Sequence, residues 1–272
     1  MDKELASVIK YFAFFDYFPE FVDVYTFFPR KISKKQLKNL IEANKYTVGE
    51  YSKNKVKSQK SKVKISRKKL DNWRFRTYIW LISLFPQIKL VGLSGSISMM
   101  NADLDDDIDL FIITKKQRLF TGRFLATIIA FIIGLKRPLG LKKASNKVCL
   151  NLFFDEGNLK IPKFKQSKFV GHEVLQMKPI INKDYTYERF LYENRWVVRF
   201  FPNTSWIMLK VKIQKSRVQV KSQNFSLLSF NFIELIFKKA QLFMINRHRT
   251  TELISNTQLW FHPDDFEKKI KF

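Results

Sequence analysis

The sequence predicts an α+β fold built around a small mixed sheet with flanking helices. Three short segments, 89–93, 108–113 and 148–154, are mostly apolar and rich in branched residues, as buried strands are. The segments around them repeat their apolar residues at helical spacing. Because strands and helices alternate through the middle of the chain, we expect the helices to pack against the sheet.

The N-terminal region, residues 1–69, is expected to be a winged-helix-like unit followed by a basic linker. Three short helices are predicted at residues 5–15, 20–28 and 34–44. Ser33 caps the third helix, and residues 46–51 predict a tight hairpin around Gly49. Helices followed by a hairpin are the order of a winged helix-turn-helix. A small helical bundle that binds nothing has the same order, so both interpretations stay open.

Residues 70–165 are expected to form the core, and residues 166–272 a helical C-terminal region. The predicted helices are 73–84 and 117–135 in the core and 185–200 and 231–247 in the C-terminal region. Residues 206–222 alternate lysine with valine and isoleucine. This pattern fits either an edge strand or a poorly ordered basic loop.

The formal net charge of +26 favours a polyanionic partner, either a nucleic acid or an anionic membrane surface. Between Arg30 and Lys69 lie fifteen basic residues and two acidic ones, so we expect RNA or DNA to bind there.

The single cysteine, Cys149, excludes an internal disulfide and a cysteine-built zinc site. No signal peptide is apparent, and the longest apolar run, 124–135, is shorter than the ~20 residues of a membrane span. A cytoplasmic location is therefore expected.

The segment 93–110 carries the residues suited to chemistry. Gly95 and Ser96 follow a strand and form a turn whose free N–H groups, at the start of a short helix, can bind phosphate oxygens. Asp107 and Asp109 lie two residues apart on the next strand, so both side chains point to one face. Adjacent carboxylates are costly without a cation, and Mg²⁺ prefers oxygen ligands. The pattern indicates a metal and phosphate site.

Two simpler interpretations of the aspartate-rich run fit less well. In a calcium-binding EF-hand loop that begins at Asp103, the required glycine would be Ile108 and the closing glutamate would be Thr114. A solvated acidic loop does not explain Asp109, which lies inside an apolar strand and would be costly to bury. Neither interpretation accounts for the Gly-Ser turn.

The segment resembles the signature of the polymerase-beta nucleotidyltransferase superfamily: an apolar residue, Gly-Ser, roughly ten residues, then Asp-apolar-Asp-apolar. The wider chain is similar to uncharacterised bacterial nucleotidyltransferase-domain proteins with a winged-helix-like N-terminus. The resemblance implies transfer of a nucleotidyl group from an NTP, such as ATP, to an unknown acceptor, with Mg²⁺ or Mn²⁺ as cofactor. Gly95 and Ser96 would bind the nucleotide, and Asp107 and Asp109 the metal.

The superfamily also needs a third carboxylate on a later strand, and two residues compete for that place. Asn151 lies mid-strand, and Asp155 lies on the same face four residues further on. Such residues are about 13 Å apart at roughly 3.3 Å per residue, so one coordination position cannot hold both. Chemistry favours Asp155 and position favours Asn151. We expect Asn151 to occupy the place, which predicts an enzyme that binds Mg²⁺–NTP and transfers slowly.

Two further function classes stay open. The first is a nucleic-acid-binding regulator with a degenerate transferase fold, and the second is an interaction protein at a membrane surface. The first would act through residues 1–69 and the second through the basic strip between Arg30 and Lys69. His172 and Glu173 are expected to be structural. Lys142, Lys143 and Lys147, which precede the third strand, could either contact phosphates or lie in a solvated loop.

Overall fold

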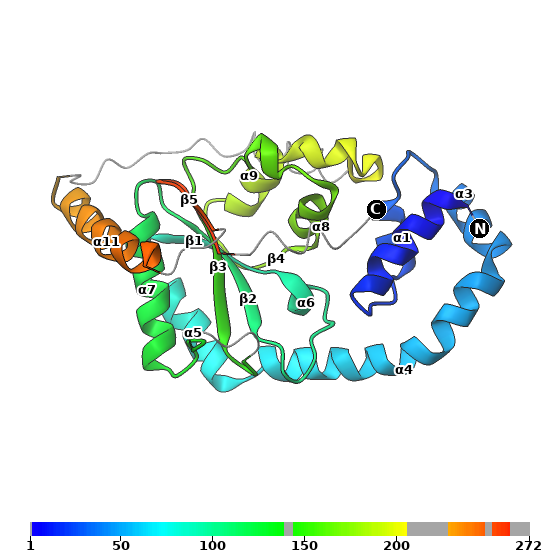
Figure 1. Cartoon of the computed structure of the whole chain (residues 1–272), viewed down its shortest axis with the longest axis horizontal. Helices are drawn as coiled ribbons and strands as arrows, with labels where there is room; N and C mark the ends of the chain where they lie inside the picture. Colours follow the sequence, from blue (N-terminus) through cyan, green and yellow to red (C-terminus); the bar gives the residue numbers. More distant parts are fainter. Residues whose placement is uncertain (1, 139–143, 206–227, 248–251, 262–272) are drawn as a thin grey trace.

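The computed structural model describes residues 2–138, 144–205, 228–247 and 252–261 (Figure 1). They form an α+β fold with a mixed six-stranded sheet in the order β4-β1-β2-β3-β6-β5. The strands are β1 Ile88–Leu93, β2 Ile108–Thr114, β3 Val148–Asp155, β4 Lys178–Asn182, β5 Leu253–Ile254 and β6 Gln258–Trp260. β2 and β3 are parallel, and the other neighbouring pairs are antiparallel. The predicted class is confirmed, and the three expected strands end within one residue of their predicted positions.

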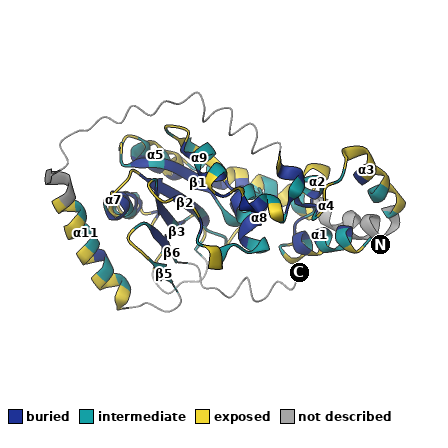
Figure 2. Cartoon of the chain, turned by 90° about the horizontal axis from the view of Figure 1, so that it is seen from above, coloured by how far each residue is buried: buried dark blue, intermediate teal, exposed yellow. Residues whose placement is uncertain are grey.

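Helices cover both faces of the sheet. The helices that follow the N-terminal region are α5 Trp73–Ser83, α6 Gly95–Ser98, α7 Leu119–Ile132, α8 Lys168–Gln176, α9 Thr186–Glu193 and α11 Leu228–Asn246. Three 3₁₀ helices accompany them, η1 Lys163–Lys165, η2 Arg195–Arg199 and η3 Pro202–Thr204. One hydrophobic core lies between the sheet and α5 and α7, and a second lies between the sheet and α8 and α9 (Figures 1 and 2).

Strand β2 supplies both cores because its side chains alternate between the two faces. Ile108 and Leu110 are buried against α5 and α7, as the sequence predicts. Phe111 and Ile113 are buried against α8 and α9. Asp109 belongs to the face of Phe111, which places its carboxylate on the side covered by α8 and α9.

The N-terminal region begins with the three predicted helices and packs on a third core, to which Phe201 also belongs. They are α1 Lys3–Phe14, α2 Phe21–Phe27 and α3 Lys34–Ala43. Ser33 caps α3 as predicted, since its hydroxyl accepts a hydrogen bond from the Gln36 amide at 3.2 Å. The Asn203 side chain joins this region to the rest of the chain: it accepts from the Ile32 amide at 3.0 Å and donates to the Arg30 carbonyl at 3.0 Å.

Residues 46–51 do not form the predicted hairpin. They belong to α4, Lys45–Leu70, a single helix of 26 residues that runs past the smaller helices (Figure 1). Lysine, a good helix former, supplies nine of the 26 residues of this segment, and helix formation along its length outweighs the cost of about 1 kcal/mol for Gly49. The hairpin prediction is wrong, and with it the sequence argument for a winged helix.

The C-terminal region is helical only in part, because three of its segments are strands. β4 pairs with β1 at one edge of the sheet, and β6 pairs with β3 toward the other. β5 and β6 have two and three residues, too few for their period to be recognised in the sequence. β6 is fixed by pairing with β3, and β5 by pairing with β6. Residues 206–222, for which the sequence left two interpretations, lie outside the described residues.

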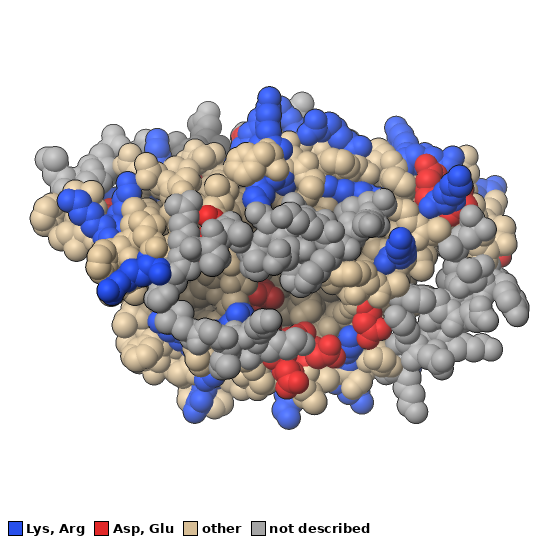
Figure 3. All heavy atoms as spheres, in the orientation of Figure 1, with Lys and Arg blue, Asp and Glu red and all other residues tan. Residues whose placement is uncertain are grey.

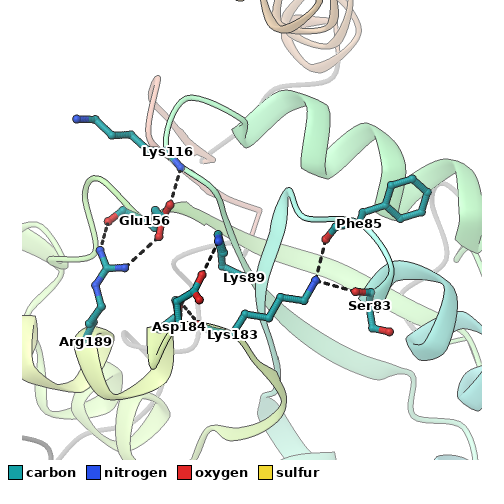
Figure 4. Close-up of polar contacts among 9 residues, drawn as sticks. Ser83, Phe85, Lys89, Lys116, Glu156, Lys183, Asp184 and Arg189 are labelled. Atoms are coloured by element: carbon teal, nitrogen blue, oxygen red, sulfur yellow. Dashed lines mark hydrogen bonds and ion pairs between the residues drawn. The ribbon is translucent and has the colours of Figure 1, made fainter. Parts of the chain in front are cut away.

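Polar contacts fix β4 and α9 to the core (Figure 4). The Lys183 ammonium donates to the carbonyls of Ser83 at 2.7 Å and Phe85 at 2.9 Å, at the C-terminal end of α5. Arg189 pairs with Glu156 at 3.0 Å, just after β3.

Among the described residues, no helix is both long and apolar enough to cross a bilayer.

Candidate functional site

The turn after β1 lies directly against Asp109. Gly95 begins α6 with a φ of +60°, a left-handed conformation that suits glycine. A Cβ atom at this position would lie 2.6 Å from Asp109 Oδ2. Ser96 turns its hydroxyl to Asp106 Oδ2 at 3.1 Å. The two halves of the sequence motif, ten residues apart, therefore meet in space.

Asp107 and Asp109 form the cluster best suited to a cation. Together with Cys149 they offer one ligand atom each, all within 4.8 Å of one another. Cys149 lies beside Asp109 because the two residues are partners in the β2–β3 ladder. A thiol is a soft ligand, whereas Mg²⁺ and Mn²⁺ prefer oxygen, so the two aspartates are the residues that could hold such an ion.

Arg137 reaches the same cluster and was missed by the sequence analysis. Its guanidinium donates to Asp107 Oδ2 at 2.5 Å and lies 3.1 Å from the Cys149 sulfur. Arg137 offsets part of the negative charge of the aspartate pair. The sequence analysis considered other basic residues before β3 for contacts with phosphates. Of these, Lys147 donates to the Gly134 carbonyl, and Lys142 and Lys143 lie outside the described residues.

Asn151 contacts the acidic cluster, and Asp155 does not. The Asn151 amide donates to Asp109 Oδ1 at 2.8 Å, and its carbonyl accepts from the Cys149 thiol at 2.7 Å. Asp155 pairs with Thr114 at the opposite end of the parallel ladder. Its oxygens accept from the amides of Gln117 and Gly157, both at 2.6 Å.

The position of Asp155 predicts a structural role. Asp155→Ala would leave two amides without their acceptor at a buried site, so we expect a loss of about 2–4 kcal/mol in the free energy of unfolding. Asp155→Asn keeps an acceptor and is expected to lose less. Urea denaturation measures both variants. Affinity for Mg²⁺–NTP is expected to stay within about twofold of the parent under conditions where the variants are folded. If the folded variants lose this affinity, Asp155 is part of the binding site.

Glu173, on α8, is a second residue of the site, although the sequence analysis expected it to be structural. It accepts a hydrogen bond from the Gly95 amide and lines the same cavity as the aspartates. Its neighbour His172, in contrast, is stacked between Tyr11, at 3.5 Å between ring centroids, and Phe27, at 4.2 Å. His172 is therefore packed among aromatic rings of α1 and α2. The local sequence gives no signal that separates the two, since only the packing of α8 on the sheet brings Glu173 to the turn.

Burial and mutual repulsion leave the acidic cluster poorly stabilised as anions. Burial raises the pKa of Asp109 to about 8, with further contributions from the charges of Asp107 and Glu173. Burial also raises the pKa of Glu173 to about 7, although the Gly95 amide opposes this shift. A bound cation would stabilise the charged forms of both carboxylates.

The cluster opens into a cavity of about 620 Å³. In Figure 3 acidic side chains gather around a hollow in this face of the molecule. The cavity is lined by Gly95, the aspartates and Glu173. Apolar side chains of the second core also line it: Phe111, Leu152, Phe154, Val174, Phe190 and Trp260. Lys62 and Lys165 also line it, although no basic residue directly follows the Gly-Ser turn.

The predicted basic strip is only partly on the surface. On α4, Lys60, Lys64, Arg67 and Lys68 are exposed. Lys62 is buried and pairs with Asp16 at 2.9 Å, and Lys69 donates to the carbonyls of Leu104 and Asp106. Lys62 also lies 3.6 Å from an Asp103 carboxylate oxygen, so both lysines contact the loop that precedes Asp107.

Comparisons with known proteins add no family to this geometry. No protein-family model matches the chain, and no curated protein or solved structure is significantly similar to it.

Proposed function

We propose that the protein is a metal-dependent nucleotidyltransferase that uses Mg²⁺ or Mn²⁺ and moves a nucleotidyl group from an NTP to an acceptor. The observation that carries the proposal is the contact between the Gly95 turn and Asp109 in the lining of a cavity of about 620 Å³. The Gly95 N–H donates to Glu173, so phosphate would be bound by the N–H groups that follow it in the turn, beside carboxylates that can bind a cation.

The residues present fit a divalent cation. Asp107 and Asp109 are adjacent, and burial raises the pKa of Asp109 to about 8 although the charge of Arg137 opposes this shift. They would hold the ion, which when bound would stabilise charge on the transferring phosphoryl group. Arg137 fixes the Asp107 carboxylate by a hydrogen bond, and Glu173 accepts a hydrogen bond from the Gly95 amide.

The apolar side chains of the cavity and Lys165 support the same assignment. A nucleotide needs cations near its phosphates and a dry surface for its base or for an acceptor. Lys165 would supply the first, and the apolar side chains around Phe111 would supply the second. Lys62 lines the same cavity but is paired with Asp16. Asn151 occupies the place nearest Asp109 where the superfamily would have a carboxylate, so we propose that transfer is slow.

The test is to incubate the protein with each labelled NTP, with Mg²⁺ or Mn²⁺ and with total cellular RNA or a small-molecule extract, and to identify what becomes labelled. Metal-dependent NTP binding, measured by calorimetry, supports the site even if turnover is slow. Absence of binding with either metal contradicts the proposal.

Gly95→Ala is expected to weaken Mg²⁺–NTP binding by at least about tenfold, because the added Cβ would displace the Asp109 carboxylate and strain the turn. Gly134→Ala is the matched control. Gly134 also has a positive φ, +72°, but a Cβ there meets nothing within 4 Å. Both variants are expected to lose about 1–2 kcal/mol of stability from the left-handed backbone. Equal affinities of the two variants would show that the turn lies outside the binding site.

A further inference from the structure

Helix α11 packs on α7 with its polar side chains inward. The Glu234 carboxylate accepts from the amides of Phe120 at 2.8 Å and Thr121 at 2.9 Å, which caps the N-terminus of α7. Gln241 donates to the Phe120 carbonyl at 2.7 Å and accepts from Arg123 at 2.6 Å. These contacts fix the rotation of α11 about its axis.

The opposite side of α11 consequently presents large apolar side chains to the outside. Phe232, Ile236 and Phe243 are spaced four and seven residues apart, so they share one face. Their exposed fractions are 65%, 49% and 64%. Leu235 and Met244 flank them and are also exposed. A surface helix of a soluble domain normally has the reverse arrangement, with its apolar stripe inward.

Helix α7 extends this apolar surface beyond the point where α11 crosses it. Phe124 stacks on Phe237 of α11, with 4.3 Å between ring centroids. Phe131, seven residues after Phe124 on the same face, is 65% exposed, and Ile132 is 74% exposed. We call the outward side chains of Phe131, Ile132, Phe232, Ile236 and Phe243 the α7–α11 surface. Exposed apolar patches of this kind mark sites of protein or membrane binding.

The charges around the α7–α11 surface decide between partners. Helices α5, α7 and α11 contain a single acidic residue, Glu234, which is engaged with α7. Basic groups stand beside the outward rings: Lys136 lies 6.0 Å from the centre of Phe131, and Arg247 lies 5.2 Å from that of Phe243. In Figure 3 basic and uncharged atoms make up most of the end of the molecule where α11 lies.

We propose that the α7–α11 surface docks on an anionic lipid bilayer. Apolar side chains flanked by lysine and arginine, without acids, match the headgroup region of such a membrane, where apolar groups enter the acyl boundary and cations meet lipid phosphates. The described helices cannot cross a bilayer, so the contact is at the interface. The proposal is independent of the transferase site, which lies on the other face of the sheet.

The experiment is flotation of the full chain with vesicles of phosphatidylcholine alone or mixed with phosphatidylglycerol. The parent is expected to float with the mixed vesicles and much less with phosphatidylcholine. The triple variant Phe232→Ser, Ile236→Ser, Phe243→Ser is expected to lose at least about tenfold in partitioning, because three apolar side chains no longer enter the bilayer. The matched control replaces three other exposed apolar residues, Val22, Leu104 and Phe164, with serine and is expected to bind like the parent.

Three results would overturn the proposal. The parent could fail to bind mixed vesicles. The triple variant could bind like the parent, which would assign binding to basic residues elsewhere, such as those of α4. In the third result the parent does not bind vesicles and the triple variant changes in another way. A loss of thermal stability would show that the surface packs against another part of this chain. The loss of an oligomer, seen by light scattering, would show that the surface binds a second copy of the chain.

Discussion

Asp109→Asn is expected to abolish metal-dependent nucleotide binding and to stabilise the protein when no divalent cation is present. The first effect follows from the loss of a carboxylate that lies beside Asp107 and against the Gly95 turn. Removing one charged partner from a buried ionic site costs about 3–5 kcal/mol, so affinity for Mg²⁺–NTP is expected to fall by at least about a hundredfold. Isothermal titration calorimetry with and without Mg²⁺ measures it.

The second effect depends on pH. The pKa of Asp109 is raised to about 8 in the folded protein, above its value in the unfolded chain, so the folded state binds this proton more tightly. The parent therefore loses stability as pH rises from about 4 to about 8, and asparagine removes this loss. Without metal, the variant is expected to exceed the parent by at least about 1 kcal/mol above pH 8 and by little near pH 4.

Asp105→Asn is the matched control, because Asp105 belongs to the same acidic run but is exposed. Its stability and its affinity for Mg²⁺–NTP are expected to stay close to those of the parent. Urea denaturation across this pH range, with and without Mg²⁺, separates the two effects. If Asp109→Asn binds Mg²⁺–NTP like the parent, the assignment of the site is wrong.

Asn151→Asp is expected to raise the transfer rate by at least about tenfold, because a positioned general base typically contributes about 10²–10⁴. The Asn151 amide already lies 2.8 Å from Asp109 Oδ1, so an aspartate there would add a third carboxylate without moving the strand. Single-turnover transfer of a labelled nucleotide, followed with saturating Mg²⁺–NTP, separates the chemical step from binding.

The new carboxylate would also repel Asp109 when no metal is present. We therefore expect the Asn151→Asp variant to be less stable than the parent without Mg²⁺ and to gain more stability from it. Asn158→Asp adds the same charge at an exposed position after β3 and is expected to change neither quantity. A rate for Asn151→Asp equal to that of the parent, in folded protein with metal bound, would show that this position is not the place of the missing carboxylate.

Local pattern was sufficient for the elements that have a clear period and a clear boundary. The central strands and the Ser33-capped helix α3 were predictable because alternation, helical spacing and capping are encoded within a few residues. The proximity of Asp109 to Gly95 was predictable for a related reason: a strand, a turn and a returning strand bring residues of a short segment together. Residues 46–51 were misread because a hairpin signal around one glycine was weaker than the helix propensity of the following twenty residues.

Long-range packing determined what the local pattern does not contain. Arg137 reaches Asp107 and Glu173 reaches the Gly95 amide because separate elements dock on one sheet, whereas the position of Asn151 along its strand already favoured it over Asp155 for the contact with Asp109. The sequence by itself determined the strands, most helices and the chemical character of the aspartate pair, since these depend on neighbours along the chain. Only the tertiary structure decided the remaining partners of that pair and the outward face of α11, since both depend on contacts between segments that the sequence places far apart.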